Sequence, residues 1–246
     1  MKKYILLAIT LATVAASVNA QSFKIVNTDG TVDTFNNDDI ACIEFSTETV
    51  APQPNVGDYY FSDGTWGPDA SAGTAIGRVF YTGLGDGDSE SNYTVSDFVN
   101  GQFHGYVVAL EDASNMAQWD VLPSVIQDYL GTSKSSSDFA GFANTQIVKG
   151  KADDFSYSFP AAYAAVNYSS KVGAPESSSG WYLPSAGQLK AVVDYDSNIL
   201  SEQSYWTSSE YSDTNAYYLS YSWISGHVCT DYGKSNACRV RAILAF

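Results

Sequence analysis

Basic residues and histidine are scarce in this 246-residue chain. Twelve lysines and arginines face 27 aspartates and glutamates, which gives a formal net charge of −15. A protein that binds a phosphate backbone or an anionic lipid surface needs a basic footprint, so the composition argues against nucleic-acid and membrane-surface binding. The two histidines, His104 and His227, lie far apart in the sequence and have no ligand-like spacing. Zinc is therefore not expected.

Long apolar runs are absent after the N-terminus. The first residues, Met1-Lys2-Lys3, are followed by the apolar stretch Tyr4–Ala16 and by the small-residue site Val18-Asn19-Ala20. This order is typical of a cleaved signal peptide, and the apolar stretch is shorter than the roughly 20 residues of a transmembrane helix. We expect residues 1–20 to be removed and the protein to be periplasmic, secreted or on the cell surface, with no membrane span.

Cysteine is also rare. Cys229 and Cys238 are separated by eight residues that can form a hairpin, so an exported chain could join them in a disulfide. Sequence spacing fixes no geometry, and two free thiols are the equal alternative. Cys42 lies in the apolar segment Ile40–Phe45 and is expected to be a buried small hydrophobe.

The chain divides into parts of different composition. Residues 21–46 form a short β element, and residues 47–55, with Pro52 and Pro54, form a linker. No second linker and no internal repeat follows, which indicates one domain over residues 56–246. The β element buries too little surface to be stable alone, so we expect it to dock on something or to add strands to a partner.

Alternation and turn residues define the strands of the β element. Phe23–Val26 alternates, Asn27–Gly30 forms a turn, and Thr31–Phe35 returns. A third strand is expected at Ile40–Phe45.

The clearest local pattern in the domain is a capped helix. Ser185 and Gln188 have the S-x-x-Q spacing of a capping box, which predicts a helix start. Its core face combines the apolar residues Ala186, Leu189, Val192 and Val193. After this helix the pattern changes to period two, which predicts a strand through Trp206–Ser209 and a second strand over Tyr217–Trp223.

Further elements follow from the same patterns. Strands are predicted at Ala75–Tyr81, Gly105–Leu110 and Cys238–Phe246, and helices at Asp138–Val148 and Phe159–Tyr168. Tyr163 and Val166 are expected on the inner face of the second helix.

Several ordered motifs resemble a known family. The sequence is similar to the Fibrobacter-type major paralogous domain of exported bacterial proteins, and this resemblance covers most of residues 56–246. The N-terminal β element resembles short elements ahead of surface domains in Bacteroidetes-type proteins, through Asp29-Gly30-Thr31 and Ile40–Phe45. The domain motifs are Asp58-Tyr59-Tyr60, Asn144-Thr145, Pro160-Ala161-Ala162, Trp181–Pro184, Tyr205–Glu210 and Arg239-Val240-Arg241.

The resemblance implies an α+β, C-type-lectin-like fold with a small, mostly antiparallel sheet flanked by two or three helices. That fold is shared with formylglycine-generating enzymes, which work through a cysteine pair. The surroundings of Cys229 and Cys238 do not match that active site, and the Glu-Pro-Asn and Trp-Asn-Asp sugar motifs of the calcium-dependent lectins are missing from this sequence.

Two groups of residues are candidates for ligand binding. Asp86, Asp88 and Glu90 place carboxylates at alternate positions of an acidic turn, where calcium is the candidate cation and a solvated turn is the alternative. The second group consists of side chains expected in surface loops, which could bind a glycan or merely form turns: Tyr211, Asp213, Asn215, Trp223 and His227.

A structural ion pair is expected near the C-terminus. Besides Arg78, the chain has only Arg239 and Arg241 as arginines, and we expect one of these two to pair with Glu210 across the sheet.

These patterns favour an exported, non-catalytic surface module that acts in adhesion or binds a glycan or protein ligand, with no cofactor beyond the calcium candidate. The alternatives are an enzyme on the same fold, of the formylglycine-generating type or a hydrolase without a recognised motif, and a structural subunit of a surface assembly.

Overall fold

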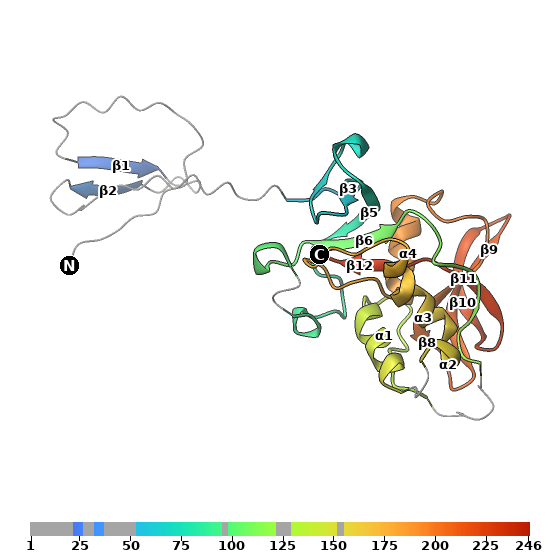
Figure 1. Cartoon of the computed structure of the whole chain (residues 1–246). Helices are drawn as coiled ribbons and strands as arrows, with labels where there is room; N and C mark the ends of the chain where they lie inside the picture. Colours follow the sequence, from blue (N-terminus) through green and yellow to red (C-terminus); the bar gives the residue numbers. More distant parts are fainter. Residues whose placement is uncertain (1–21, 27–31, 37–52, 95–97, 122–128, 152–154) are drawn as a thin grey trace. The chain divides into compact units, whose positions relative to one another are not determined.

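The computed structural model describes residues 22–26, 32–36, 53–94, 98–121, 129–151 and 155–246 (Figure 1). The chain divides into two compact units, residues 1–53 and residues 54–246. In the described part, no helix is long and apolar enough to cross a membrane. The predicted signal peptide, most of the linker, the predicted third strand and Cys42 lie outside the described residues.

The N-terminal unit contains an antiparallel hairpin. Strand β1 (Ser22–Val26) pairs with β2 (Val32–Asn36), with Ser22 opposite Asn36 and Val26 opposite Val32. The hairpin predicted from alternation and turn residues is confirmed.

The described part of the second unit contains two five-stranded sheets. The first is antiparallel and has the order β12-β6-β5-β3-β4, and Figure 1 shows β6 beside β12. Every residue of β6 is buried, as expected for an apolar strand between two neighbours. Its strands are β3 (Tyr59–Phe61), β4 (Trp66–Gly67), β5 (Ala75–Thr82), β6 (Gly105–Ala109) and β12 (Ile243–Ala245).

The second sheet has the order β10-β9-β8-β11-β7. Strand β11 runs parallel to β8, and the other neighbours are antiparallel. Strand β10 is therefore an edge of this sheet. The strands are β7 (Ser114–Gln118), β8 (Tyr205–Glu210), β9 (Asn215–Ser222), β10 (Gly226–Gly233) and β11 (Ala237–Val240).

The C-terminal segment crosses from one sheet to the other. The single strand predicted for Cys238–Phe246 is wrong, because β11 belongs to the second sheet and β12 to the first. At the crossing, Arg241 donates from Nη1 to the carbonyl oxygens of Ala109 and Leu110, at 2.9 and 3.1 Å. These bonds hold the chain where it leaves one sheet and enters the next.

Four α-helices are found in the described residues: α1 (Gly141–Gly150), α2 (Phe155–Ser158), α3 (Pro160–Asn167) and α4 (Ala186–Tyr195). Helix α3 buries Ala161, Ala162 and Ala165, whereas Tyr163 is 37 % exposed and Val166 is half-buried. The predicted inner face of this helix is wrong, because the small alanines let its backbone approach the sheet closely. Short 3-10 turns occur at Ala70–Ala72, Glu90–Asn92, Val99–Gly101 and Tyr168–Ser170.

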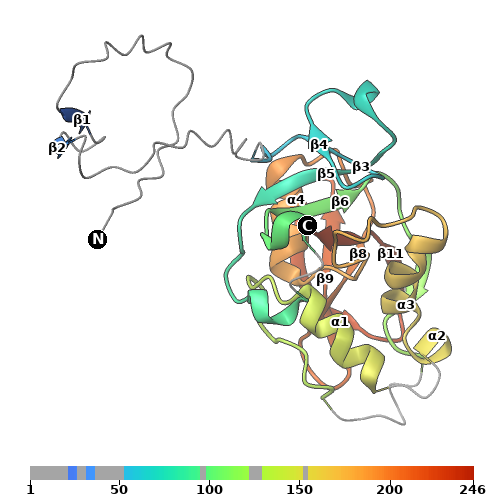
Figure 2. The same cartoon turned by 60° about the vertical axis from the view of Figure 1, so that its left-hand side comes forward.

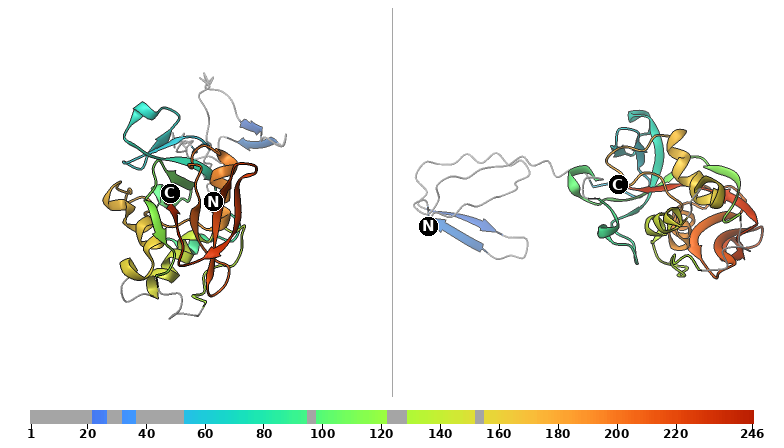
Figure 3. Two further views of the ribbon diagram at one scale, coloured as in Figure 1. Left: turned by 90° about the vertical axis from the view of Figure 1, so that its right-hand side faces the viewer. Right: turned by 60° about the horizontal axis from the view of Figure 1, so that its bottom comes forward.

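The helices cover both faces of the second sheet. In β8, Trp206 points into a core shared with Phe159 and the alanines of α3, while Tyr205 points into a core shared with Leu189 and Val192 of α4. Figure 2 shows α1 and α3 together on one side of the sheets, and Figure 3 shows the same arrangement from two further directions. The architecture is a mixed, mostly β arrangement, consistent with the predicted α+β class, but the lectin-like fold is not confirmed.

The capping box at α4 is confirmed. The backbone N–H of Gln188 donates to Ser185 Oγ at 3.3 Å, and the N–H of Ser185 donates to Gln188 Oε1 at 3.0 Å. Ser185 Oγ also donates to the carbonyl of Asp138 at 2.6 Å. A Cβ at Gly187 would stand 2.3 Å from the backbone of Ser137. The first turn of α4 is thus fixed by capping and by close contact with the preceding loop.

Loss of the cap should weaken the fold. Ser185 is fully buried, and Ser185→Ala removes both the cap and the bond to Asp138. We expect a loss of about 1–2 kcal/mol in the free energy of unfolding, measured by urea titration. Ser197→Ala, at an exposed serine after the helix, is the control. Equal midpoints for the two variants would contradict a stabilising cap.

His104 makes the stability of the fold sensitive to acid. Its side chain is 3 % exposed, and its ring centroid lies 4.8 Å from that of Trp66 and 5.9 Å from that of Phe246. Burial lowers the pKa of His104. The unfolded chain therefore binds a proton more readily than the folded one, and protonation favours unfolding.

The free energy of unfolding should stay level above about pH 6.5, the ordinary pKa of histidine, and fall as the pH drops below it. In His104→Phe this part of the decrease should disappear, because no proton can then be taken up at that site. Urea titrations between pH 7.5 and 5 measure how the unfolding free energy changes with pH in the unmodified protein and in His104→Phe. Identical slopes in the two proteins would exclude His104 as the source of the acid sensitivity.

Candidate functional site

The tip of the β9–β10 hairpin is the most exposed apolar feature of the described residues. Trp223 is 85 % exposed and Ile224 is 98 % exposed. The Trp223 ring contacts that of Tyr221 edge-on at 5.8 Å, and Gly226 closes the turn with a φ of 66°. The turn thus presents an aromatic and an aliphatic side chain to solvent on an edge hairpin.

The predicted ligand-binding residues do not form one site. Tyr211, Asp213 and Asn215 lie where β8 turns into β9, and Trp223 follows the opposite end of β9. Eight residue steps of a strand separate Asn215 from Trp223, which corresponds to about 26 Å. The Tyr211 loop and Trp223 therefore lie at opposite ends of β9.

The loop before β9 is held by its own contacts. Asn215 Nδ2 donates to Asp231 Oδ2 at 2.7 Å, and the N–H of Thr214 donates to Asp213 Oδ1 at 2.9 Å. Tyr211 packs edge-on against Tyr217 at 5.3 Å. The Thr214 bond is that of a turn and the Asn215 bond joins β9 to β10, and ligand binding by these residues stays a prediction.

His227 lies at the start of β10, near the hairpin tip. Its ring contacts Tyr221 at 5.1 Å, and its Nε2 lies 3.2 Å from the carbonyl oxygens of Ser201 and Gln203. Two hollows of about 430 and 460 Å³ share His227 and Val193 in their walls. His227 thus lies between α4 and the hairpin.

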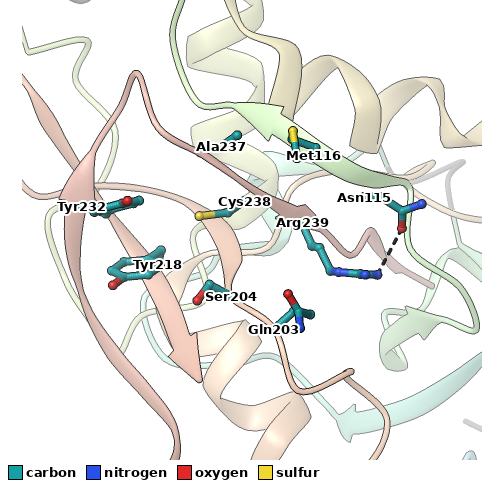
Figure 4. Close-up of a pocket in the computed structure, with 9 residues that line it drawn as sticks. All are labelled: Asn115, Met116, Gln203, Ser204, Tyr218, Tyr232, Ala237, Cys238 and Arg239. Atoms are coloured by element: carbon teal, nitrogen blue, oxygen red, sulfur yellow. Dashed lines mark hydrogen bonds between the residues drawn. The ribbon is translucent and has the colours of Figure 1, made fainter. Parts of the chain in front are cut away.

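A third pocket, of about 350 Å³, lies on the second sheet (Figure 4). Figure 4 shows Tyr218 and Tyr232 on one side of it, Arg239 and Asn115 on the other, and the sulfur of Cys238 turned toward the tyrosines. Its remaining lining residues are Met116, Gln203, Ser204 and Ala237.

The two C-terminal arginines bind an aspartate, so the predicted pairing with Glu210 is wrong. Arg239 Nη1 lies 2.7 Å from Asp112 Oδ2, and Arg241 Nε lies 2.7 Å from Asp112 Oδ1. Asp112 follows β6, next to the crossing of the C-terminal segment. The two arginines correctly indicate a structural carboxylate partner. The sequence does not show which of the 27 aspartates and glutamates is that partner.

Glu210 pairs with Lys234 instead. Lys234 Nζ lies 2.5 Å from Glu210 Oε1, and the two side chains are 1 % and 0 % exposed. The carboxylate also accepts the backbone N–H groups of Leu130 and Thr132 and the hydroxyl of Thr132. Nζ lies 4.6 Å from the ring centroid of Trp119. Because each charge has several partners, this pair is a structural element of the interior.

Of the two alternatives for Cys229 and Cys238, the structure has the free thiols. They lie on β10 and β11, and strands β9 and β8 lie between those strands in the sheet. The residues between them do not form a hairpin, because β10 pairs backward with β9 and not forward with β11. Burial raises the pKa of Cys238 to about 12 and also raises that of Cys229.

The acidic turn is organised around Asp88. Its Oδ2 accepts the hydroxyls of Tyr93 and Tyr106, both at 2.6 Å, and its Oδ1 accepts from Asn92 at 2.9 Å. Asp86 contributes its carbonyl to the N–H of Phe139, and Glu90 begins a 3-10 turn. The described residues contain no group of three or more His, Cys, Asp or Glu side chains that could hold a metal ion. Calcium binding at the acidic turn stays a prediction.

Comparisons with known proteins find similarity to fimbrial proteins. No protein-family model matches this chain. A putative fimbrium tip subunit, Fim1C, from Bacteroides ovatus is 27 % identical over 124 residues, which are 44 % of this chain and 23 % of that protein. The crystal structure of a fimbrial protein from the same species superposes with a TM-score of 0.56 at 20 % identity, over 78 % of this chain and 49 % of that chain.

These similarities correct the resemblance drawn from short motifs. The relatives are fimbrial proteins, so the assignment to the Fibrobacter-type domain family, related to the formylglycine-generating enzymes, is wrong. This chain spans about a quarter of the curated relative and half of the solved one. The structural likeness therefore shows a shared fold.

Breaking the buried pair should be costly. Lys234→Met leaves Glu210 as a buried charge without its cation, and we expect a loss of about 3–5 kcal/mol in unfolding free energy. The double variant Glu210→Gln/Lys234→Met should regain part of this loss, because it leaves no uncompensated charge in the interior. Urea unfolding of Lys234→Met, Glu210→Gln and the double variant measures the difference. A double variant as unstable as the sum of the single ones would contradict coupling between the two side chains.

Proposed function

We propose that this protein is an exported, non-enzymatic subunit of a fimbrial assembly on the bacterial surface. The similarity to fimbrial proteins from Bacteroides ovatus, in sequence to one and in fold to another, carries this proposal. The signal-peptide pattern of residues 1–20 supports export. The partners are other surface subunits, and the N-terminal hairpin is an element for such contacts, since a two-stranded hairpin is marginally stable by itself.

We further propose that the hairpin tip serves adhesion to a glycan or protein ligand. Trp223 and Ile224 are the support, because exposed aromatic and apolar side chains on a projecting turn lose water when a partner covers them. Tyr221 packs beside Trp223, which lowers the ordering that this one side chain needs on binding.

Fractionation and binding test the two parts of this proposal. In cells that produce the protein, we expect it in the sheared fimbrial fraction, detected with an antibody. The double variant Trp223→Ala/Ile224→Ala should reach the same fraction, but its ligand attachment should fall at least about tenfold. A tenfold loss corresponds to about 1.4 kcal/mol of binding free energy. Attachment is measured on glycan and matrix-protein arrays.

The control is Leu84→Ala, which removes a 40 % exposed apolar side chain after β5 and should retain attachment. Both variants should unfold within about 0.5 kcal/mol of the unmodified protein, as exposed substitutions do. A protein that never enters the fimbrial fraction would contradict the assembly role, and attachment unaffected by the double variant would contradict the role of the tip.

A further inference from the structure

The pocket of Figure 4 has an aromatic wall. Tyr218 and Tyr232 stack with centroids 4.9 Å apart and an interplanar angle of 26°, and Trp206 lies behind both at about 6 Å. The Trp206 ring behind the wall is fixed in place, because its indole N–H donates to the carbonyl of Ala117 at 2.9 Å. Tyr232 is 39 % exposed. The stacked rings turn their edges across the pocket toward Arg239, and these apolar edges can pack against a sugar ring (Figure 4).

The opposite side of the pocket carries a positive charge. Two arginines share the single carboxylate of Asp112, so the three side chains together hold one unbalanced positive charge. Arg241 is buried and turned to backbone carbonyls, whereas the Arg239 side chain is 31 % exposed and lines the pocket. The excess charge therefore faces solvent at Arg239, in a protein whose net charge is −15.

Arg239 is also preorganised. Its Nη1 donates to Asp112 and, at 3.1 Å, to Asn115. A guanidinium has five N–H donors, more than Asp112, Asn115 and the nearby Tyr205 hydroxyl take up. It can therefore offer further donors to a carboxylate from a fixed position.

The rest of the pocket is neutral. Burial raises the pKa of Cys238 to about 12, so its thiol adds no negative charge at physiological pH. Asn115, Gln203 and Ser204 supply amide and hydroxyl groups for hydrogen bonds. The volume of about 350 Å³ lies at the small end of the range for ligand pockets, which fits one or two sugar rings.

We propose that this pocket binds a carboxylate-bearing sugar, with the ring packed on Tyr218 and Tyr232 and the carboxylate on Arg239. The site is separate from the hairpin tip, since Tyr232 lies near the far end of β10 from Trp223. The proposal therefore goes beyond the adhesive function of the tip and does not depend on it.

Titration of the full chain with matched sugars tests the proposal. The probes are methyl β-D-glucuronide and methyl β-D-glucoside, which differ in the carboxylate, observed by saturation-transfer NMR. We expect the glucuronide to bind at least about tenfold more tightly, as a charge-assisted bond allows. Arg239→Gln should reduce this preference to near one, and Tyr232→Ala should weaken both sugars by a similar factor.

Three matched variants complete the design. Arg239→Lys keeps the charge and should keep part of the preference even if Arg239→Gln disturbs the fold. Lys190→Gln removes a surface cation elsewhere and should change nothing, and Trp223→Ala should leave glucuronide binding intact. Absence of glucuronide binding, equal affinity for the two probes, or a preference that survives in folded Arg239→Gln would each overturn the proposal.

Discussion

The buried pair of Glu210 and Lys234 lies where the ends of several strands of the second sheet come together. Lys234 follows β10, and Glu210 ends β8. The backbone of Lys234 also accepts the N–H groups of Trp119 and Asp120 after β7 and donates to Thr214 before β9. A charge in the interior needs a complete set of partners, and this requirement fixes the ends of four strands relative to one another. The hairpin and the pocket of Figure 4 depend on that positioning.

The C-terminal segment supplies the second constraint. Strand β11 lies in one sheet and β12 in the other, so the same few residues connect both sheets and both cores. Arg241 stabilises the crossing through Asp112 and through backbone carbonyls. Arg239, two residues earlier, shares Asp112 but remains half-exposed. The carboxylate of Asp112 thus balances the charge of the buried Arg241, and the charge of Arg239 remains at the surface.

Local chemistry could be predicted from the sequence, and long-range partners could not. The cap at Ser185 depends on residues three positions apart, and the exposure of Trp223 depends on an adjacent turn, so both were correct. In the segment predicted as one strand, every second residue, namely Val240, Ala242, Leu244 and Phe246, lies in one core, yet alternation does not say which strand lies alongside. The partner of Glu210 was missed because Lys234 lies in a Gly-Lys-Ser-Asn segment that looks like an exposed turn.

The family resemblance failed for a related reason. Its motifs, such as Trp181–Pro184 and Tyr205–Glu210, are buried segments of this structure. Buried aromatic and small residues in a given order record packing, which unrelated proteins can share by convergence on similar cores. Ligand recognition depends instead on exposed groups whose positions are set by distant residues. In this chain Arg239 and Tyr232 line the same pocket although β9 and β8 lie between β11 and β10, an arrangement that no local pattern contains.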